Sequence, residues 1–448
     1  MIRRTRAGAA VLSLAVILGL AGCSDSGSDS SDGPVTLDYW LWDDNQKASY
    51  QACADAFTAA NPTITIKITQ SAWDLYWQNL TTQLAAGEAP DVWTNQGSYY
   101  PQFVTSNQIL DIQPYVDADK VDLTQYQGGL ADLFTKDGKR YGLPKDWDTM
   151  ALVYNTGYLE KLGIKAADLQ NLTWNPADGG SFEQLIAKAT TDTSGRNGLD
   201  PAFDKSKIKT YGYLPEWADG SQGQNGWGNL AAMNGFTYLD KNPWGTQYKY
   251  DDPALAQTIE WFKSLIAKGY SPPLEKNSSL SRDTVMQSGK GAITMAGSWT
   301  INTYLGDAKT KFAFAPLPAG PQGRKTAING LSDAIWAGTE HKDAAWKWVK
   351  FLGSADCQNI VGGNGVVFPA IKSASDKALE AHKSKGRDVQ PFIDEAQAPN
   401  GTFFLPITDH GKEVSQIVQD AIQSSVLGQS DSASALTKAN EQVNALFK

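Results

Sequence analysis

The spacing of apolar and polar positions changes several times over the part of the chain that begins at residue 35. Residues 35–42 (VTLDYWLW) alternate as a β-strand with one apolar face does, whereas residues 46–60 carry apolar side chains at helical spacing. Residues 64–68 alternate again, residues 75–86 return to helical spacing, and residues 90–93 begin a third short strand. This order of strand, helix, strand, helix and strand predicts an α/β fold with parallel strands and right-handed crossovers.

The carboxyl ends of these three predicted strands are where a ligand is expected, because open α/β sheets bind ligands in the crevice at that edge. The segments at that edge are WDDN at 42–45, SAW at 71–73 and NQ at 95–96. Their indoles offer flat apolar faces to a sugar ring, and their amides and carboxylates offer partners to its hydroxyls. We therefore expect a binding site that contains Trp42, Asp43, Trp73 and Asn95. A core or helix-entry position is an equal alternative for both indoles.

The first 23 residues form a separate segment. Arginines at positions 3, 4 and 6 precede an apolar run over residues 9–22, which is shorter than the about 20 residues that span a bilayer. The run ends in Leu20-Ala21-Gly22-Cys23, which resembles the bacterial lipobox, in which the cysteine receives a lipid and becomes the mature N-terminus. We interpret residues 1–23 as a lipoprotein signal peptide and Cys23 as the lipidation site. An ordinary signal peptide with a chance cysteine is the alternative.

Residues 24–34 follow as a predicted tether. Residues 24–33 (SDSGSDSSDG) contain no apolar side chain and are expected to be disordered, spanning roughly 17 Å as a flexible coil. About 415 residues follow, more than one hydrophobic core usually holds, so two lobes are expected. No later stretch approaches 18 consecutive apolar residues. We expect an exported protein that its lipid anchors to the outer face of the cell membrane.

Charge and composition narrow the choice of ligand. The formal net charge of −9 and a pI near 5.0 argue against nucleic acid, which requires a basic surface. The 15 tryptophans favour a site in which aromatic rings stack on a ligand. The spacings CxxC, HxH and HExxH do not occur in the sequence, so neither a metal nor another cofactor is expected.

Several segments, taken in order along the chain, resemble a known family. They are PDVW at 90–93, YGLP at 141–144 with DTMALVYN at 148–155, GKGAITM at 289–295 with GSW at 297–299, PLPAGP at 316–321, and AAWKWVKFL at 344–352. Together they are similar to the bacterial extracellular solute-binding protein family 1, the maltose-binding-protein-like group. The resemblance runs over nearly all of residues 35–448, and it agrees with the lipobox.

The resemblance implies a two-lobe periplasmic-binding-protein fold of the α/β class, with a hinge and a ligand cleft between the lobes. Residues 35–145 and about 310–372 would form the first lobe, and residues 146–309 and about 373–448 the second. The resemblance also implies a monomeric carbohydrate-binding lipoprotein, rather than an enzyme. Such a protein would deliver its ligand to the permease subunits of an ABC importer. The tryptophan-rich polar loops favour an oligosaccharide as that ligand, with more than one ring to stack.

Two cysteines remain once Cys23 is lipidated, Cys53 and Cys357. The resemblance places both in the same lobe, which favours a disulfide in an exported protein. Two separate buried thiols are the alternative.

Further candidate ligand-binding residues follow from the implied crossing between the lobes. Trp147 and Asp148 fall at the first crossing, where the floor of the cleft is implied, and a solvated turn is the alternative reading. Trp299 ends the GSW segment, and an aromatic residue there is implied to face the cleft.

Polar loops supply the remaining candidates. Trp217, Trp227 and Trp244 stand in stretches rich in Gly, Asn, Asp and Gln, where little core is expected, so at least one should stack on ligand. Asp333 and the neighbouring pair Asp409 and His410 could bind sugar hydroxyls, with a helix cap as the alternative for Asp409.

Two other classes of function remain open. A secreted glycoside hydrolase needs two carboxylates about 5 to 9.5 Å apart, and 48 acidic residues always supply such a pair. A binding protein of the same fold could instead take iron, a polyamine or an organic anion. Tyr99-Tyr100 resembles the paired tyrosines of ferric-binding relatives, but adjacent side chains diverge and no other cluster supports iron. An anion would favour arginine in the cleft loops, and these loops contain none.

Overall fold

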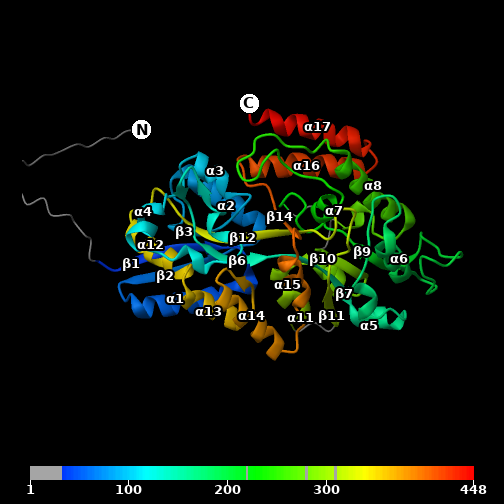
Figure 1. Cartoon of the computed structure of the whole chain (residues 1–448), viewed down its shortest axis with the longest axis horizontal. Coiled ribbons are helices and arrows are strands. Elements are labelled where there is room, and N and C mark those ends of the chain that lie inside the picture. The colour runs from blue at the N-terminus through cyan, green and yellow to red at the C-terminus, as the bar shows by residue number, and fades with distance from the viewer. Residues whose placement is uncertain (1–32, 218–219, 278–280, 307–309) are drawn as a thin grey trace, which may run out of the picture. The chain divides into compact units, whose positions relative to one another are not determined.

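The computed structural model describes residues 33–217, 220–277, 281–306 and 310–448 (Figure 1). The predicted signal peptide, the predicted lipidation site Cys23 and residues 24–32 of the predicted tether lie outside these ranges. Within the ranges, no helix is both long enough and apolar enough to span a bilayer.

The first part of the chain forms the strands and helices that its pattern predicts. Strand β1 (Val35–Leu41) pairs in parallel with β2 (Ile64–Gln70) and β3 (Val92–Gln96). Helices α1 (Asp44–Ala60) and α2 (Trp73–Ala86) connect these strands. The βαβαβ order and the parallel pairing are therefore confirmed, with element ends that differ from the prediction by a few residues.

These strands belong to a seven-stranded sheet in the order β13-β6-β12-β3-β1-β2, with β14 paired to β12. The later strands of this sheet are β6 (Pro144–Asp148), β12 (Thr326–Ile335), β13 (Phe368–Pro369) and β14 (Thr402–Phe404). Strand β12 runs antiparallel to both β3 and β6.

Helices cover both faces of this sheet (Figure 1). Helix α1, with α12 (Lys342–Leu352) and α13 (Ala355–Asn364), packs on the face that carries Leu37, Tyr39 and Leu41 of β1. Helix α2 and α3 (Tyr100–Thr105) join a second buried cluster with Trp93 of β3, against which Trp40 also packs. Alternate residues of β1 therefore enter different clusters.

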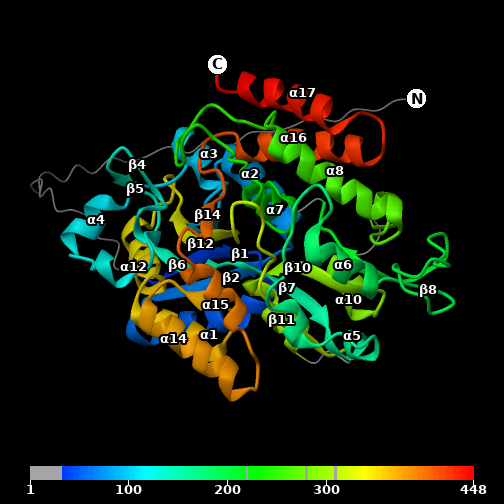
Figure 2. The same ribbon diagram turned by 45° about the vertical axis from the view of Figure 1, so that its right-hand side comes forward.

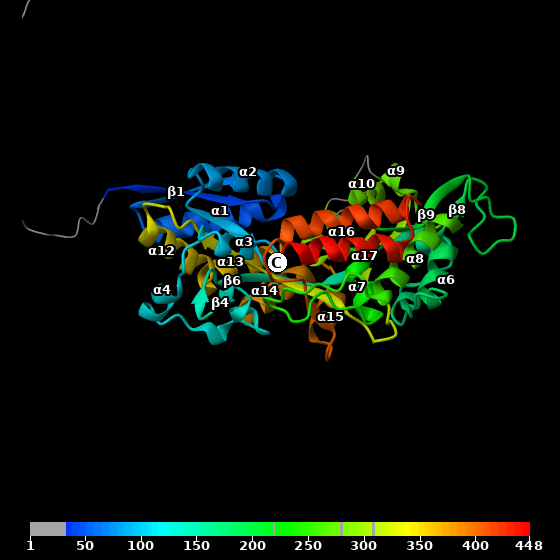
Figure 3. The same cartoon turned by 90° about the horizontal axis from the view of Figure 1, so that it is seen from above.

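A second sheet has five strands in the order β11-β7-β10-β9-β8. They are β7 (Met150–Asn155), β8 (Thr191–Asp192), β9 (Ile208–Leu214), β10 (Gly291–Gly297) and β11 (Phe312–Ala315). Helices α6 (Gly180–Ala189), α8 (Pro253–Lys268), α16 (Gly411–Val426) and α17 (Ser432–Ala445) share a buried cluster with this sheet. Figures 2 and 3 show α16 and α17 beside α8.

Shorter elements complete the described chain. They are α4 (Gln113–Ala118), β4 (Thr135–Lys136), β5 (Lys139–Arg140), α5 (Thr156–Lys161), α7 (Trp227–Met233), α9 (Leu274–Asn277), α10 (Arg282–Gln287), α11 (Ile301–Leu305), α14 (Lys372–Ser384) and α15 (Gln390–Gln397), with four short 3-10 turns.

In the described chain, consecutive strands pass from one sheet to the other at two places. Thr149 alone separates β6 from β7, and the second passage leads from β11 to β12. Thr149 is fully buried, and its hydroxyl donates to the carbonyl oxygen of Phe392 at 2.7 Å. The amide of Met150 donates in turn to the hydroxyl of Thr326, so the two passages are joined by a hydrogen bond. The predicted residue limits of the two lobes stay a prediction.

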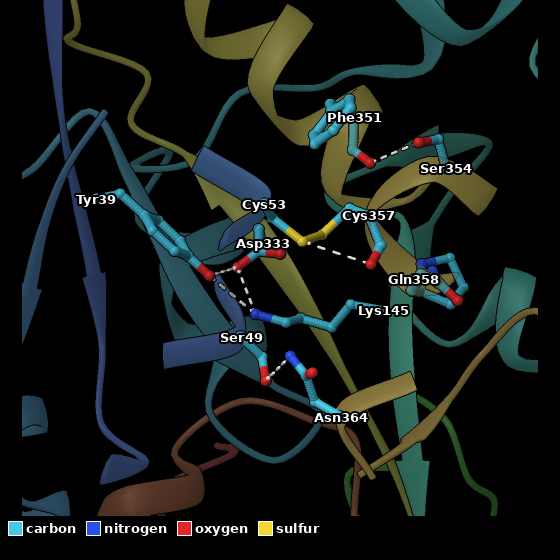
Figure 4. The surroundings of a disulfide bond; sticks show 11 residues. Tyr39, Ser49, Cys53, Lys145, Asp333, Phe351, Ser354, Cys357, Gln358 and Asn364 are labelled. Atoms are coloured by element: carbon cyan, nitrogen blue, oxygen red, sulfur yellow. Dashed lines mark hydrogen bonds and ion pairs between the residues drawn. A yellow bond between two sulfur atoms is a disulfide. The ribbon is translucent and has the colours of Figure 1, made fainter. Parts of the chain in front are cut away.

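A disulfide joins Cys53 of α1 to Cys357 of α13, with the two Cα atoms 5.2 Å apart (Figure 4). Both cysteines are fully buried. Nearby, the side-chain amide of Asn364 donates to the hydroxyl of Ser49 and forms a second link between the same two helices. The pairing that the sequence favoured is therefore present in the structure.

Candidate ligand-binding site

A cavity of about 320 Å³ lies at the carboxyl ends of β1 and β3. The segments of the seven-stranded sheet and its loops contribute Trp42, Asp43, Asp44, Gln46, Trp73, Gln96, Asp146, Trp147, Asp148, Asn329, Leu331 and Val367. The segments that follow β9 and β10 contribute Ser221, Gln224, Asn225, Ser298 and Trp299. Both sheets therefore border the cavity, as expected for a cleft between two lobes.

One wall of the cavity is aromatic. Trp42 follows β1 and Trp73 begins α2, and their half-buried indoles meet edge to face with ring centres 5.1 Å apart. Trp77 packs against both, and Tyr99 stacks on Trp77 at 4.2 Å. The buried rings of Trp77 and Tyr99 therefore support the two half-buried indoles from behind.

Two further indoles border the cavity. Trp147 of β6 is only 5% exposed and stacks on Phe368 at 4.9 Å. Trp299 lies in the short turn after β10 and is half-buried. Gly297 permits its position, because a Cβ atom there would lie 1.9 Å from the Trp299 ring.

Asp43, Asp146 and Asp148 line the cavity at unequal depth. Asp43 caps α1, where its carboxylate accepts from the Asn45 amide at 2.9 Å and from the Gln46 side chain at 2.7 Å. Asp146 is 3% exposed, and its Oδ1 accepts from the Leu331 amide at 3.2 Å. Asp148 Oδ1 accepts from Gln224 Nε2 at 2.9 Å.

The surroundings raise the pKa of all three carboxyl groups. Burial is the main cause in each case. For Asp146, burial outweighs the attraction of Lys145 and raises the pKa to about 7. For Asp148, burial and the neighbouring Asp146 raise the pKa well above its ordinary value.

A buried ammonium group lies behind the cavity. Lys145 Nζ is 3.1 Å from Asp333 Oδ1 and donates to the hydroxyl of Tyr39 (Figure 4). It also donates to the hydroxyl of Thr94. It also lies 3.9 Å from the centre of the Tyr50 ring. Asp333 therefore pairs with Lys145 and does not line the cavity.

The structure brings six of the predicted ligand-binding residues together around the cavity, namely Trp42, Asp43, Trp73, Trp147, Asp148 and Trp299. Their contact with a ligand stays a prediction. Asn95 is fully buried in β3 and is not among the lining residues. Asn95 lies inside the strand, one residue before the lining residue Gln96, and adjacent strand residues point to opposite faces of the sheet. Its side chain therefore does not reach the cavity wall.

The expectation that Trp217 and Trp227 had little core to join is wrong. Trp217 is 5% exposed and packs against Phe262 of α8, and Trp227 packs against Tyr238. Their partners lie elsewhere in the sequence, so the polar residues around each indole did not reveal the core. Neither side chain lines the cavity.

Trp244, Asp409 and His410 also lie outside the cavity. Trp244 Nε1 donates to the carbonyl oxygen of Thr135 at 3.0 Å, and Lys136 Nζ lies 4.3 Å from its ring centre. His410 precedes α16 and contacts Phe447, with ring centres 5.2 Å apart. The Asp409 carboxylate accepts from the backbone amide of His410.

Several lining residues were not predicted from the sequence, among them Gln224, Asn225 and Ser298. Within the described chain, four buried polar atoms of lining residues lack a hydrogen-bond partner: Gln96 Oε1, Asp146 Oδ2, Trp147 Nε1 and Ser298 Oγ. Ser298 adjoins the predicted Trp299, and that adjacency was the available signal. Buried polar atoms without partners are costly, so these four are suited to contact a polar ligand.

Comparison with known proteins places the chain in a family. Residues 52–386 match the family described as "Bacterial extracellular solute-binding protein". The chain belongs to this family. This match confirms the resemblance inferred from the sequence segments. The chain is therefore an exported solute-binding protein, and its family consists of binding proteins rather than enzymes.

Characterised relatives resemble most of the chain. The maltodextrin-binding protein of Bacillus subtilis is 26% identical over 344 residues, covering 75% of this chain and 73% of the relative. The arabinooligosaccharide-binding protein of the same organism is 24% identical over 355 residues, covering 76% of this chain and 74% of the relative.

Solved structures show the same fold. UspC of Mycobacterium tuberculosis matches with a TM-score of 0.70 and 25% identity, covering 92% of this chain and all of that one. An ABC substrate-binding protein of Listeria monocytogenes in complex with cycloalternan matches with a TM-score of 0.79 and 18% identity, covering 92% and 98%. The predicted two-lobe periplasmic-binding-protein fold is confirmed.

Proposed function

We propose that this solute-binding protein is a carbohydrate-binding lipoprotein that binds an oligosaccharide and delivers it to an ABC importer. The observation that carries the proposal is the cavity itself, in which four indoles border the same space as side-chain amides, carboxylates and hydroxyls. A pyranose requires this mixture, because its apolar face packs on an aromatic ring while its hydroxyls require fixed donors and acceptors.

The distribution of the indoles supports more than one sugar ring. Trp42 and Trp73 form one wall, whereas Trp299 comes from the segment after β10 of the other sheet. Among the described residues, no Lys, Arg or His lines the cavity, which argues against an organic anion. The maltodextrin-, arabinooligosaccharide- and galactooligosaccharide-binding relatives of Bacillus subtilis support the same class of ligand.

The second half of the proposal concerns the lipid anchor and the ABC importer. Lipid attached to Cys23 would hold the protein at the outer face of the cell membrane, where it would meet the permease subunits as a monomer. The lipobox-like LAGC segment at residues 20–23 supports this part. Release of an intact ligand distinguishes the proposal from a glycoside hydrolase, which would cleave it.

The test is a thermal-shift screen of the full chain, purified in detergent, against oligosaccharides. Monosaccharides, amino acids, polyamines and ferric ion serve as the other ligand classes. A ligand at 100 times its Kd stabilises the folded state by about 2.7 kcal/mol, which raises the melting temperature measurably. We expect a shift with one class of oligosaccharide, which chromatography then recovers uncleaved. Shifts with non-sugars alone would overturn the carbohydrate assignment, and cleavage products would favour the hydrolase.

Growth and labelling experiments test the anchor and the importer. Labelling cells with a fatty-acid analogue should tag the wild-type protein, and Cys23→Ser should abolish the tag. Deleting the gene that encodes this protein should abolish uptake of the bound sugar by the cell that normally produces it. A tagged Cys23→Ser protein would contradict the anchor, and unchanged uptake would contradict delivery.

A further inference from the structure

The cavity carries an excess of negative side chains. Four carboxyl groups line it, those of Asp43, Asp44, Asp146 and Asp148. No cationic side chain of the described residues stands among the lining residues to balance them. The nearest ammonium group in the sequence, Lys145 Nζ, is directed to Asp333, Tyr39 and Thr94 and is therefore engaged behind the wall.

Asp146 is the side chain with the greatest need for a partner. It is 3% exposed, and its Oδ1 accepts one backbone hydrogen bond, from Leu331. Its Oδ2 is buried and has no partner in the part of the chain that the structure describes. An isolated buried carboxylate is expensive unless it is paired with a cation or hydrogen-bonded.

Asp148 lies two residues further along the same strand, at the surface of the cavity, and it too has no cationic partner in the described chain. Its only side-chain partner in the described chain is the amide of Gln224, a neutral group. The groups that act on this pair are Lys145, which favours ionisation of Asp146, and Asp43 and Asp333, which oppose it. Asp146 in turn opposes ionisation of Asp148.

We propose that the sugar bound in this cavity is an amino sugar, whose protonated amine contacts Asp146 and Asp148. The inference rests on the carbohydrate function proposed above and specifies its ligand class. An ammonium group offers up to three hydrogen bonds and a positive charge, so it satisfies Asp146 Oδ2 and balances the carboxylates together.

The remaining lining residues favour an amino sugar over a linear polyamine. Gln96 Oε1 and Ser298 Oγ are buried without partners in the described chain, and they suit sugar hydroxyls that a polyamine does not carry. Trp42 and Trp299 supply flat faces for a sugar ring. The cavity therefore combines a site for a cation with a site for a polyol.

The first test compares matched sugars by isothermal titration of the full chain in detergent. The set contains three matched series: the amino sugars glucosamine and galactosamine, their N-acetylated forms, and the neutral sugars glucose and galactose. Each series also includes the disaccharides built from its sugars, and spermidine represents the polyamines. We expect at least one amine-bearing sugar to bind tenfold or more tighter than its acetylated and hydroxyl counterparts. Neutral sugars that bind equally well or better would overturn this inference and leave the carbohydrate function standing. Binding of spermidine alone would overturn both, whereas binding of none of these ligands would overturn this inference and leave the carbohydrate function to the screen.

Variants locate the effect in the two carboxylates. Asp146→Asn and Asp148→Asn keep the shape and one oxygen acceptor but lose the charge, so each should weaken binding of the amino sugar at least tenfold. Binding of the neutral counterpart should weaken less, so the preference for the amine should narrow. Asp55→Asn, at an exposed position on the outer side of α1, is the matched control and should leave affinity within about twofold. Equal losses for amine and neutral sugars would contradict the inference.

Proton release provides a readout that does not depend on a variant folding. Burial raises the pKa of Asp146 to about 7, so near pH 6.5 much of this carboxyl group carries a proton. A cationic ligand should drive that proton off, and titration in two buffers with different ionisation heats measures the release. Proton uptake, or no exchange, on binding the amino sugar would overturn the inference.

Discussion

Gln224 donates a hydrogen bond of 2.9 Å from its Nε2 atom to Oδ1 of Asp148. Gln224 lies in the segment after β9 of the five-stranded sheet, whereas Asp148 is the last residue of β6 in the seven-stranded sheet. Both side chains line the cavity. The bond therefore links the two sides of the proposed binding cleft at the point where a ligand would lie.

Replacing Gln224 with alanine should weaken this link. We expect the free energy of unfolding to fall by about 1 kcal/mol, the usual net value of a hydrogen bond, and ligand affinity to fall as well. Chemical denaturation and isothermal titration measure the two effects. Gln51→Ala removes a comparable Gln–Asp contact on the exposed side of α1 and should change neither quantity appreciably. An unchanged affinity for Gln224→Ala would show that the link is not part of ligand binding.

The indoles at the cavity should contribute to sugar binding individually. Trp42→Ala and Trp299→Ala each remove a large apolar surface and should cost about 1 to 3 kcal/mol of binding free energy, or about 5-fold to 150-fold in Kd. Titration with the sugar identified in the screen measures this loss. Trp336→Ala is the control, because Trp336 is also half-buried but does not line the cavity. A loss of stability without a loss of affinity is expected for that variant alone.

Local pattern placed the two indoles of the first wall at the correct edge of the sheet, although it left a core or helix-entry position equally open for both. Trp42 and Trp73 follow or begin elements whose ends are visible in the sequence, so strand topology placed both at one edge of the sheet. Trp147, Asp148 and Trp299 depended instead on the family resemblance, because neither the crossing after β6 nor the position of the GSW segment follows from periodicity.

Tertiary packing decided what the sequence could not. Trp217 and Trp227 stand among polar and glycine residues, yet each packs against an aromatic ring that lies elsewhere in the chain, Phe262 and Tyr238 respectively. Asp333 was expected in a polar loop, but it lies within β12, and its pairing with Lys145 depends on the register of β12 beside β3 and β6. Non-local contacts of this kind leave no periodic pattern in the sequence.

The disulfide should contribute substantially to stability. Cys53→Ser together with Cys357→Ser removes a link between residues 304 positions apart, and we expect the free energy of unfolding to fall by about 2 to 4 kcal/mol. Thermal unfolding of both proteins with and without a reducing agent measures the effect. Reductant should destabilise the wild type and leave the double variant unchanged. Equal responses would show that the cysteines are not paired in the folded protein.

Glu395 of α15 should make the stability of the protein depend on pH. Its side chain is fully buried beside the second passage between the sheets, where Oε1 accepts from the Leu317 amide at 3.0 Å and lies 3.5 Å from Arg324 Nε. Burial outweighs the attraction of Arg324 and raises the pKa of Glu395 to about 7, whereas an unfolded glutamate has a pKa near 4.3.

Between these two pKa values the folded protein retains a proton that the unfolded chain has released. The contribution of Glu395 to stability is therefore fully present below about pH 4.3 and is lost as the pH rises through about 7. Glu395→Gln stays uncharged, so its melting temperature should fall less between pH 5 and pH 7.5, by about 2 °C, than that of the wild type. Glu441→Gln, at an exposed position of α17, is the control and should follow the wild-type curve. Parallel curves for wild type and Glu395→Gln would mean that Glu395 is already ionised at pH 5, and that the pairing with Arg324 outweighs burial.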